Sequence, residues 1–121
     1  MVRVLVVDDL AEVRGVVRIA LRLRSQIEVV GEATTSFSAV ELAAHLQPDV
    51  VVLDLLLPDS SHGRVTYQRL QAASPKSKLV IYTGHDTDPG WYRTHGAAGF
   101  VDKGTGVNQL VDAVEHATSA A

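Results

Sequence analysis

Residues 48–58 read PDVVVLDLLLP and contain the longest run of apolar side chains in the chain, interrupted by Asp54. A short run of Val and Leu bounded by prolines predicts a strand, here over residues 49–55, that is buried on both faces of a parallel sheet. Placing a carboxylate inside such a run is costly unless its charge has a partner. We therefore expect Asp54 to serve a function rather than to stabilise the fold.

The sequence on either side of this stretch alternates between strand and helix patterns. Short aliphatic segments predict further strands over residues 2–7, 27–32, 78–82 and 98–101. Helical spacing predicts helices over 11–24, from Ser36 to the helix-breaking Pro48, over 64–73, from Asp88 to His95, and from Val107 onward. This order implies an α/β fold with a doubly wound parallel sheet and helices on both faces. The tail 117–121 is expected to be weakly structured.

Length and composition exclude several classes of protein. The chain has 121 residues, a formal net charge of −3 and no cysteine. We expect one domain over residues 1–121 and no second domain. The charge balance does not favour direct nucleic-acid or membrane binding, and the lack of cysteine excludes disulfides and thiolate metal sites. Without a long apolar segment near the N-terminus, a cytoplasmic location is the default expectation.

Two helices are assigned an apolar face from their spacing. For residues 11–24 the expected buried stripe consists of Val13, Val16 or Val17, Ala20 and Leu23. On another face of the same helix, Arg14, Arg18 and Arg22 are expected to be solvated. For the next helix, we expect Ser36 to cap the N-terminus and the apolar side to consist of Phe37, Val40, Ala44 and Leu46.

Polar side chains follow the strands at their carboxyl ends, where open parallel sheets bind ligands. These residues are Asp8, Asp9, Asp54, Thr83 and Lys103. Each one has an ordinary alternative interpretation: the first two could cap a helix, the threonine could simply end a strand, and the lysine could lie on the surface. The argument for a site depends on their convergence at one edge of the sheet.

Such a cluster predicts metal-assisted phosphoryl chemistry. Two carboxylates 4 Å apart repel by about 4 kcal/mol at an effective dielectric constant of 20, so three of them need a shared proton or a cation. Oxygen ligands alone favour Mg²⁺ or Mn²⁺ over zinc. A divalent ion beside a lysine and a hydroxyl suits phosphoryl transfer, and an aspartate nucleophile would give an aspartyl phosphate.

Four segments together resemble the response-regulator receiver domain of two-component signal transduction. They are VLVVDD ending at Asp9, PDVVVLDLLLP around Asp54, VIYTG with Thr83, and GFVDK with Lys103. The segment IEVVGEA further resembles receivers that precede helix-turn-helix transcription-factor domains. The resemblance implies a flavodoxin-like fold with strand order 2-1-3-4-5.

The resemblance also implies a metal site. Asp9 would bind Mg²⁺, with Mn²⁺ as an alternative, directly, and Asp8 would bind it mainly through water. Asp54 and the backbone carbonyl of Leu56 would complete the protein ligands. The phosphoryl group would then be transferred to Asp54 as the phosphoacceptor.

Three further residues take roles from the resemblance. Thr83 would hydrogen-bond the phosphoryl group, Lys103 would pair with it, and Phe100 would be the aromatic switch coupled to the threonine. The implied partner is a sensor histidine kinase or phosphotransfer protein, with a homodimer on phosphorylation and an output in transcription through a linked DNA-binding domain. The chain would thus be a regulator and not a turnover enzyme.

The sequence departs from the family pattern at three places. Gly63 stands one position later than the glycine of the family pattern, so the loop after Asp54 is expected to follow a different path. Gly104 follows Lys103 where many members carry a cis proline, and this glycine is expected to hold the lysine less firmly. The segment between Thr83 and Phe100 is about two residues short, which predicts a reduced helix around Trp91.

Alternative functions remain open from the residues alone. The main alternative is a phosphorylation-independent, receiver-like interaction module. An aspartate phosphatase is disfavoured because Asp8 and Asp9 are adjacent, and a nucleotide-binding domain lacks its glycine-rich loop. Two finer hypotheses concern Leu56 with His85, which could shield the phosphoaspartate from water, and the arginine face, which could contact a kinase.

Overall fold

The computed structural model describes residues 1–60, 62–84 and 88–119. Its elements, in chain order, are β1 (Val2–Val7), α1 (Ala11–Arg22), β2 (Ile27–Ala33), α2 (Ser36–Leu46), β3 (Val50–Leu53), α3 (Gly63–Ala73), β4 (Lys78–Thr83), α4 (Pro89–Thr94), β5 (Gly99–Asp102), a 3₁₀ turn (Lys103–Thr105) and α5 (Val107–Thr118). The predicted elements are present. β3 is shorter than predicted, so Asp54 lies just beyond its end, and α5 extends through Ala117 and Thr118, which were expected to be weakly structured.

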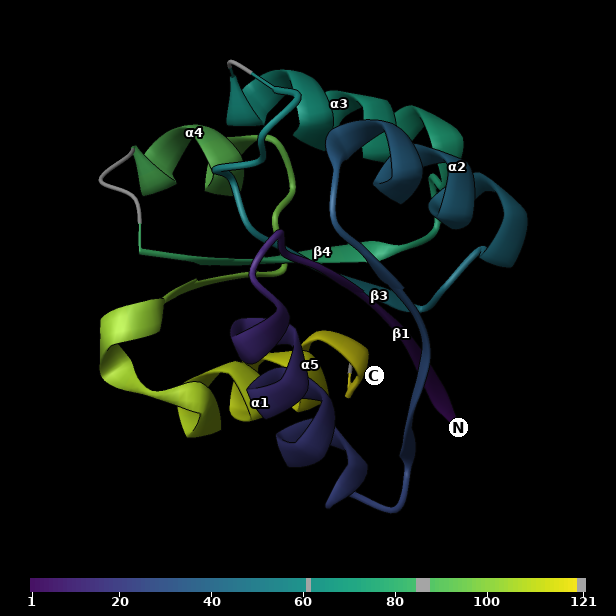
Figure 1. The fold of residues 1–121 in the computed structure, drawn as a ribbon, viewed down its shortest axis with the longest axis vertical. Coiled ribbons are helices and arrows are strands. Elements are labelled where there is room, and N and C mark those ends of the chain that lie inside the picture. Colours follow the sequence, from purple (N-terminus) through teal and green to yellow (C-terminus); the bar gives the residue numbers. More distant parts are fainter. Residues whose placement is uncertain (61, 85–87, 120–121) are drawn as a thin grey trace.

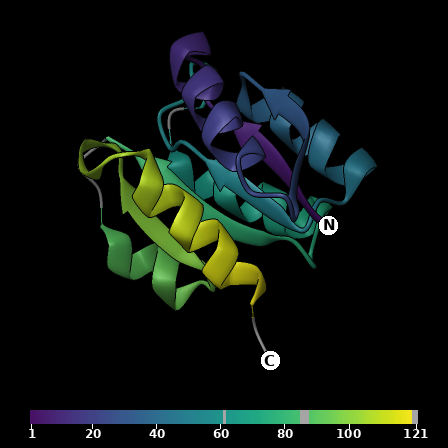
Figure 2. The same cartoon turned by 90° about the horizontal axis from the view of Figure 1, so that it is seen from below.

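The strands form one parallel sheet in the order β2-β1-β3-β4-β5, as predicted. Helices α2, α3 and α4 lie on one face of the sheet, and α1 and α5 lie on the other (Figure 1). Seen from below in Figure 2, α1 and α5 lie across the near face. Among the described residues, no helix has the length and apolar character needed to cross a bilayer.

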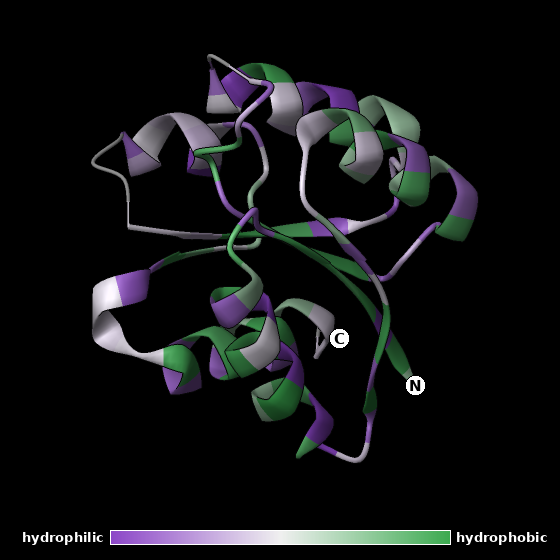
Figure 3. Cartoon of the chain, in the orientation of Figure 1, coloured by the Kyte–Doolittle hydropathy of each residue, from purple (hydrophilic) through white to green (hydrophobic). Residues whose placement is uncertain are grey.

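Each face of the sheet has its own hydrophobic core. Along β1, Val4 and Val6 pack with α1 and α5, whereas Leu5 and Val7 pack with the helices of the opposite face. Because side chains alternate along a strand, a nearly continuous apolar strand supplies both cores. The strands are accordingly hydrophobic along most of their length (Figure 3). The carboxyl edge of the sheet is therefore held rigidly from both sides.

The prediction for the buried face of α1 is partly wrong. Val17 and Leu21 are buried, whereas Val16 and Leu23 are exposed, Leu23 with 80% of its surface. Residues 17 and 21 are one turn apart and face the sheet, while Leu23 lies after the last helical residue. The arginine face is also not simply solvated. Arg14 and Arg18 both bind the Glu32 carboxylate, at 3.3 and 2.7 Å.

The predicted cap of α2 is wrong, and its predicted apolar face is partly wrong. Thr35 is the N-cap, and its hydroxyl accepts a hydrogen bond from the Ser38 N–H in a capping box. The buried apolar side chains are Ala39 and Ala43, with the predicted Val40 partly buried beside them, while Phe37 is 70% exposed. The helix thus packs mainly through small side chains, and Phe37 lies on the outside.

The loop between β3 and α3 is held in place by Asp59. The Asp59 carboxylate accepts hydrogen bonds from the backbone N–H groups of Ser36 at 2.7 Å and Phe37 at 3.0 Å, the first two residues of α2. The Thr66 hydroxyl lies 2.9 Å from the Ser36 hydroxyl and donates to Ser60 at 3.0 Å. Side chains of the loop and α3 are therefore bonded to the start of α2.

Gly63 allows α3 to begin close to its neighbours. A Cβ atom on Gly63 would lie 2.9 Å from the Leu55 Cβ and 2.9 Å from the Tyr92 hydroxyl. Contacts this short are not tolerated without movement, and both neighbouring side chains are buried. The glycine is therefore required by close packing of the loop, α3 and α4.

The shortened segment forms α4, which packs against α3 through aromatic rings. The Trp91 ring stacks on the His95 ring at 3.9 Å, and the Arg64 guanidinium lies 4.9 Å from the Trp91 centroid. The Tyr67 hydroxyl and the Gln71 amide of α3 both donate to the His95 carbonyl, at 3.0 and 2.7 Å. One face of α3 thus fixes both the rings and the end of α4.

We predict that Gly63→Ala destabilises the protein by about 1–3 kcal/mol, because the new methyl group overpacks a rigid contact. Gly15→Ala is the matched control, since its methyl group would meet only the Arg18 guanidinium at 3.7 Å. Within α1, alanine is expected to stabilise by about 0.5–1 kcal/mol. Urea unfolding measures both changes, and equal effects of the two substitutions would contradict this account of Gly63.

A second prediction concerns acid unfolding. Hydrogen bonds from the Phe37 and Ser36 backbone N–H groups hold the pKa of Asp59 below its usual range. A depressed pKa stabilises the fold above the unfolded value near 4, and this contribution is lost as the pH falls through the folded pKa. Asp59→Asn should therefore be less stable than the wild type near pH 7 and equally stable near about pH 2. A difference in urea midpoint that does not change with pH would contradict the ionic origin.

Candidate functional site

The predicted residues converge in a pocket at the carboxyl edge of the sheet. The pocket has a volume of about 340 Å³ and is lined by Asp9, Leu10, Asp54, Leu56, Thr83, Gly84 and Lys103. These residues come from the ends of β1, β3, β4 and β5, far apart in the sequence. The structure therefore confirms that these side chains lie together, whereas their individual roles remain predictions. Leu10 and Gly84 were not predicted as lining residues, although each follows a predicted residue.

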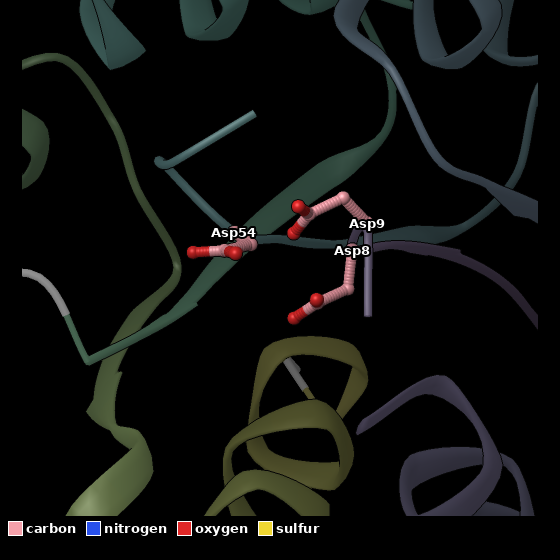
Figure 4. A group of neighbouring side chains, drawn as sticks. All are labelled: Asp8, Asp9 and Asp54. Carbon is pink, nitrogen blue, oxygen red and sulfur yellow. The ribbon is translucent and has the colours of Figure 1, made fainter. Parts of the chain in front are cut away.

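Three carboxylates form the acidic part of the pocket. One oxygen from each of Asp8, Asp9 and Asp54 lies within 4.8 Å of the other two, and Figure 4 shows the side chains meeting where β1 and β3 end. Asp8 and Asp54 are only 2% and 4% exposed, while Asp9 is exposed. Two of the three charges are therefore removed from most of the solvent.

Lys103 neutralises part of this charge. Its ammonium lies 2.6 Å from the Asp8 Oδ2 and 3.3 Å from the Asp54 Oδ2. On the other side of the Asp54 carboxylate, the Thr83 hydroxyl donates to Oδ1 at 2.9 Å. The Leu56 backbone N–H also donates to this oxygen at 3.3 Å. Both oxygens of Asp54 are thus oriented by groups from other strands.

The strand alternation explains why the lysine meets Asp8. Val4 and Val6 face α1 and α5, and Asp8 continues this alternation one step past β1. On β5, Val101 faces the same side, and Lys103, two residues further along the chain, points to that side as well. The two charged groups therefore emerge on the same side of the sheet, and the long lysine side chain spans the distance across the ends of β3 and β4, which lie between β1 and β5.

Burial and pairing shift the pKa values of this ion pair. Burial raises the pKa of Asp8 above its ordinary value, although the hydrogen bond from Lys103 acts in the opposite direction. For Lys103, burial lowers the pKa, but the hydrogen bond with Asp8 and the charge of Asp54 outweigh it, so the net pKa is raised. The lysine is therefore a stable cation in this site.

The alternative interpretation of Asp8 as a helix cap is not supported. The N-cap of α1 is Leu10, and no side chain caps this helix. The Asp8 Oδ1 instead accepts from the Leu10 N–H at 2.9 Å, a bond within the turn that precedes the helix. Asp8 and Asp9 thus form a local turn after β1, and each still contributes a carboxylate oxygen to the acidic cluster.

The donor set fits a hard divalent cation. Three carboxylates and one ammonium leave a formal charge of −2. The three carboxylates offer oxygen atoms as ligands, the type that Mg²⁺ and Mn²⁺ prefer. Of the three carboxylates, that of Asp9 is the exposed one, so it is the most accessible to an incoming ion.

Two further residues with predicted roles lie outside the acidic cluster. Phe100 is partly buried, with its ring 6.0 Å from the ring of Tyr92. Leu56 is 61% exposed at the rim of the pocket. His85, the other residue of the shielding hypothesis, lies outside the described residues.

Comparison with known proteins agrees with this geometry. The family model described as the response regulator receiver domain matches residues 4–115. The response regulator GacA of Pseudomonas aeruginosa is 36% identical over 117 residues, covering 94% of this chain and 54% of GacA. VraR of Staphylococcus aureus is 33% identical over 115 residues, covering 93% of this chain and 54% of VraR. The solved receiver domain of NarL from Mycobacterium tuberculosis has a TM-score of 0.84 at 32% identity and covers 98% of each chain.

The chain therefore belongs to the response regulator receiver domain family. Its homologues GacA, NreC and VraR are response regulators of the LuxR/NarL type. The chain spans about half the length of these curated relatives, 54% in the case of GacA. The predicted resemblance and the predicted fold are both confirmed.

We predict that Lys103→Met destabilises the metal-free protein by about 1–3 kcal/mol. Removing one partner of a buried ion pair costs roughly 3–5 kcal/mol, and the partial exposure of this lysine reduces the figure. Lys76→Met, which removes an exposed lysine, is the matched control. Both are measured by urea unfolding in EDTA, and equal stabilities of the two variants would contradict a stabilising role for the ion pairs.

Proposed function

We propose that this domain accepts a phosphoryl group on Asp54 from a sensor histidine kinase or phosphotransfer protein, in a Mg²⁺-dependent reaction. The observation that supports the proposal best is the engagement of both Asp54 oxygens, one by Thr83 and one by Lys103. An oxygen of Asp54 would attack the phosphorus of a phosphohistidine, the P–N bond would break, and the imidazole would leave. The domain would thus be consumed as an acceptor rather than turn over as an enzyme.

The acidic cluster would hold the metal ion. Asp9 and Asp54 would be direct ligands, Asp8 would act mainly through water, and the Leu56 carbonyl would be a further ligand. When bound, Mg²⁺ supplies neutralisation of the charge on the transferring phosphoryl oxygens. Two observations support this division of roles: both Asp8 oxygens already have partners, Lys103 at 2.6 Å and the Leu10 N–H at 2.9 Å, whereas the Asp9 side chain is exposed.

Thr83 and Lys103 would stabilise the product. A phosphoryl group adds nearly two negative charges and three acceptor oxygens at Asp54. The hydroxyl and the ammonium already lie within 3.3 Å of the carboxylate that would carry it. Both groups would then exchange carboxylate oxygens for phosphoryl oxygens as partners.

We further propose that this exchange is transmitted through Phe100. The Phe100 ring lies 6.0 Å from Tyr92, which belongs to the aromatic cluster on α4. A shift of Thr83 toward the phosphoryl group would open space for the Phe100 ring. Complete switching needs about 5.5 kcal/mol of differential stabilisation, so partial activation is expected when the gain is smaller.

The relatives support a proposal for the cellular role. Among them is YxjL of Bacillus subtilis, named as an uncharacterized transcriptional regulatory protein, and the relatives are about twice as long as this chain. We propose that residues 1–121 are one receiver domain that acts in the cytoplasm, dimerises on phosphorylation and controls transcription through a linked DNA-binding domain. The net charge of −3 supports a domain that does not itself bind nucleic acid.

We predict one added phosphoryl group in the intact mass after incubation with acetyl phosphate or phosphoramidate. The adduct should require both Mg²⁺ and Asp54, because the metal-free cluster is negatively charged and repels the phosphodonor. Asp54→Ala is the control, measured beside the wild type with Mg²⁺ and with EDTA. The emission of Trp91, the single tryptophan, should change along with the mass if α4 responds to phosphorylation.

The opposite result has a defined meaning. A folded wild-type sample that gains no mass with either donor would contradict the phosphoacceptor function. The remaining candidate would be the phosphorylation-independent interaction module.

A further inference from the structure

Lys103 needs a support other than its carboxylate partners. In the proposed function, on which this inference rests, the lysine leaves an oxygen of Asp54 for an oxygen of the phosphoryl group. The ion pair with Asp54 at 3.3 Å is therefore lost in this step, and of the two ion pairs only the one with Asp8 at 2.6 Å is common to both states. A single ion pair leaves part of the direction of the ammonium to the backbone and to the contacts of the lysine side chain.

Asp102, the residue before Lys103, is bonded to the two residues that follow the lysine. The Asp102 Oδ1 accepts from the Gly104 N–H at 2.7 Å, and the Asp102 carbonyl accepts from the Thr105 hydroxyl at 2.8 Å. Asp102 is the last residue of β5, where it pairs in register with Thr83 of β4. The turn that carries the lysine is therefore fixed to the strand position opposite the other phosphoryl-binding residue.

Gly104 and Asp102 depend on each other. The Lys103–Gly104 peptide is trans, and Gly104 supplies the N–H group that Asp102 binds. A proline at this position would have no N–H to donate. A Cβ atom on Gly104 would also lie only 3.0 Å from the Asp102 Oδ1. The two residues thus form a compact turn through a hydrogen bond that a proline at position 104 could not make.

The aliphatic part of the Lys103 side chain, its stem, packs along the backbone at Gly84. A Cβ atom built on Gly84 would lie 3.9 Å from both the Cβ and the Cδ of the lysine, so the stem runs along this backbone. The Lys103 ammonium lies 6.0 Å from the centroid of the Tyr82 ring, which is buried. With the stem confined, the backbone of the turn decides where the ammonium points.

We propose that Asp102 is a positioning residue for the phosphorylation reaction. Its carboxylate holds the Gly104 N–H, and this bond directs the Lys103 ammonium at the oxygens of Asp54 and of the incoming phosphoryl group. Asp102 touches neither the phosphodonor nor the metal. It acts only through the lysine.

The test is the initial rate of acetyl phosphate phosphorylation of the full chain, followed by intact mass at saturating Mg²⁺. Asp102→Ala should slow the reaction about fivefold, the effect of one ordinary hydrogen bond. Asp102→Asn keeps the acceptor oxygen without the charge and should stay within about twofold of the wild type. Asp112→Ala, which removes an exposed carboxylate from α5, controls for net charge and should leave the rate unchanged.

A double-mutant comparison separates positioning from general damage. If Asp102 acts through Lys103, Asp102→Ala should have no further effect in a Lys103→Ala background. The Mg²⁺ concentration at half-maximal rate should also stay unchanged, since the metal ligands are intact. An equal slowing in both backgrounds, or a wild-type rate for Asp102→Ala, would overturn the inference.

The outcomes also distinguish this inference from the proposed function. A wild-type chain that forms no Asp54 adduct refutes the proposed function and the inference with it. A normal wild-type adduct with an unaffected Asp102→Ala variant refutes only the inference. Circular dichroism checks folding, and if Asp102→Ala does not fold, Gly104→Ala provides the same test, because its methyl group would crowd the Asp102 oxygen.

Discussion

Mutual repulsion among three carboxylates constrains this molecule more than any other interaction. Asp8, Asp9 and Asp54 hold oxygens within 4.8 Å of one another, and two of these residues are almost fully buried. Such an arrangement persists only if the surrounding packing fixes the strand ends and a cation compensates part of the negative charge. The two apolar cores supply the first condition, and Lys103 supplies the second. The site can therefore respond to any change in the local charge.

The loops around the site are held by hydrogen bonds to acidic side chains. Asp59 connects the loop after Asp54 to the first turn of α2, and Asp102 holds the turn that follows β5 through a local bond to Gly104. Both use a carboxylate that accepts from backbone N–H groups. In each case the family pattern is altered nearby, at Gly63 and at Gly104. The acidic side chains thus compensate for local changes in the chain path.

The sequence alone predicted the fold and the convergence of Asp54, Thr83 and Lys103, because strand ends in a parallel sheet must share one edge. It predicted the buried residues of α1 only in part, with Val17 buried but Leu23 exposed, and it misplaced the apolar side of α2. Phe37 has the spacing of a core residue, yet α2 packs through Ala39 and Ala43. Periodicity identifies the apolar faces of a helix, but when a helix has two such faces it does not tell which one packs against the sheet. The bonds of Asp59 and Arg14 also escaped prediction, since their partners lie on other elements and depend on the paths of the loops.

The packing of α4 on α3 sets a rule for building chimeric regulators. Trp91 lies between Arg64 and His95, and Tyr92 fits against Gly63. A longer fourth helix transplanted from a relative would meet an α3 surface shaped for a single short turn of aromatic side chains. An exchange of α4 between related domains would therefore have to replace α3 and α4 together.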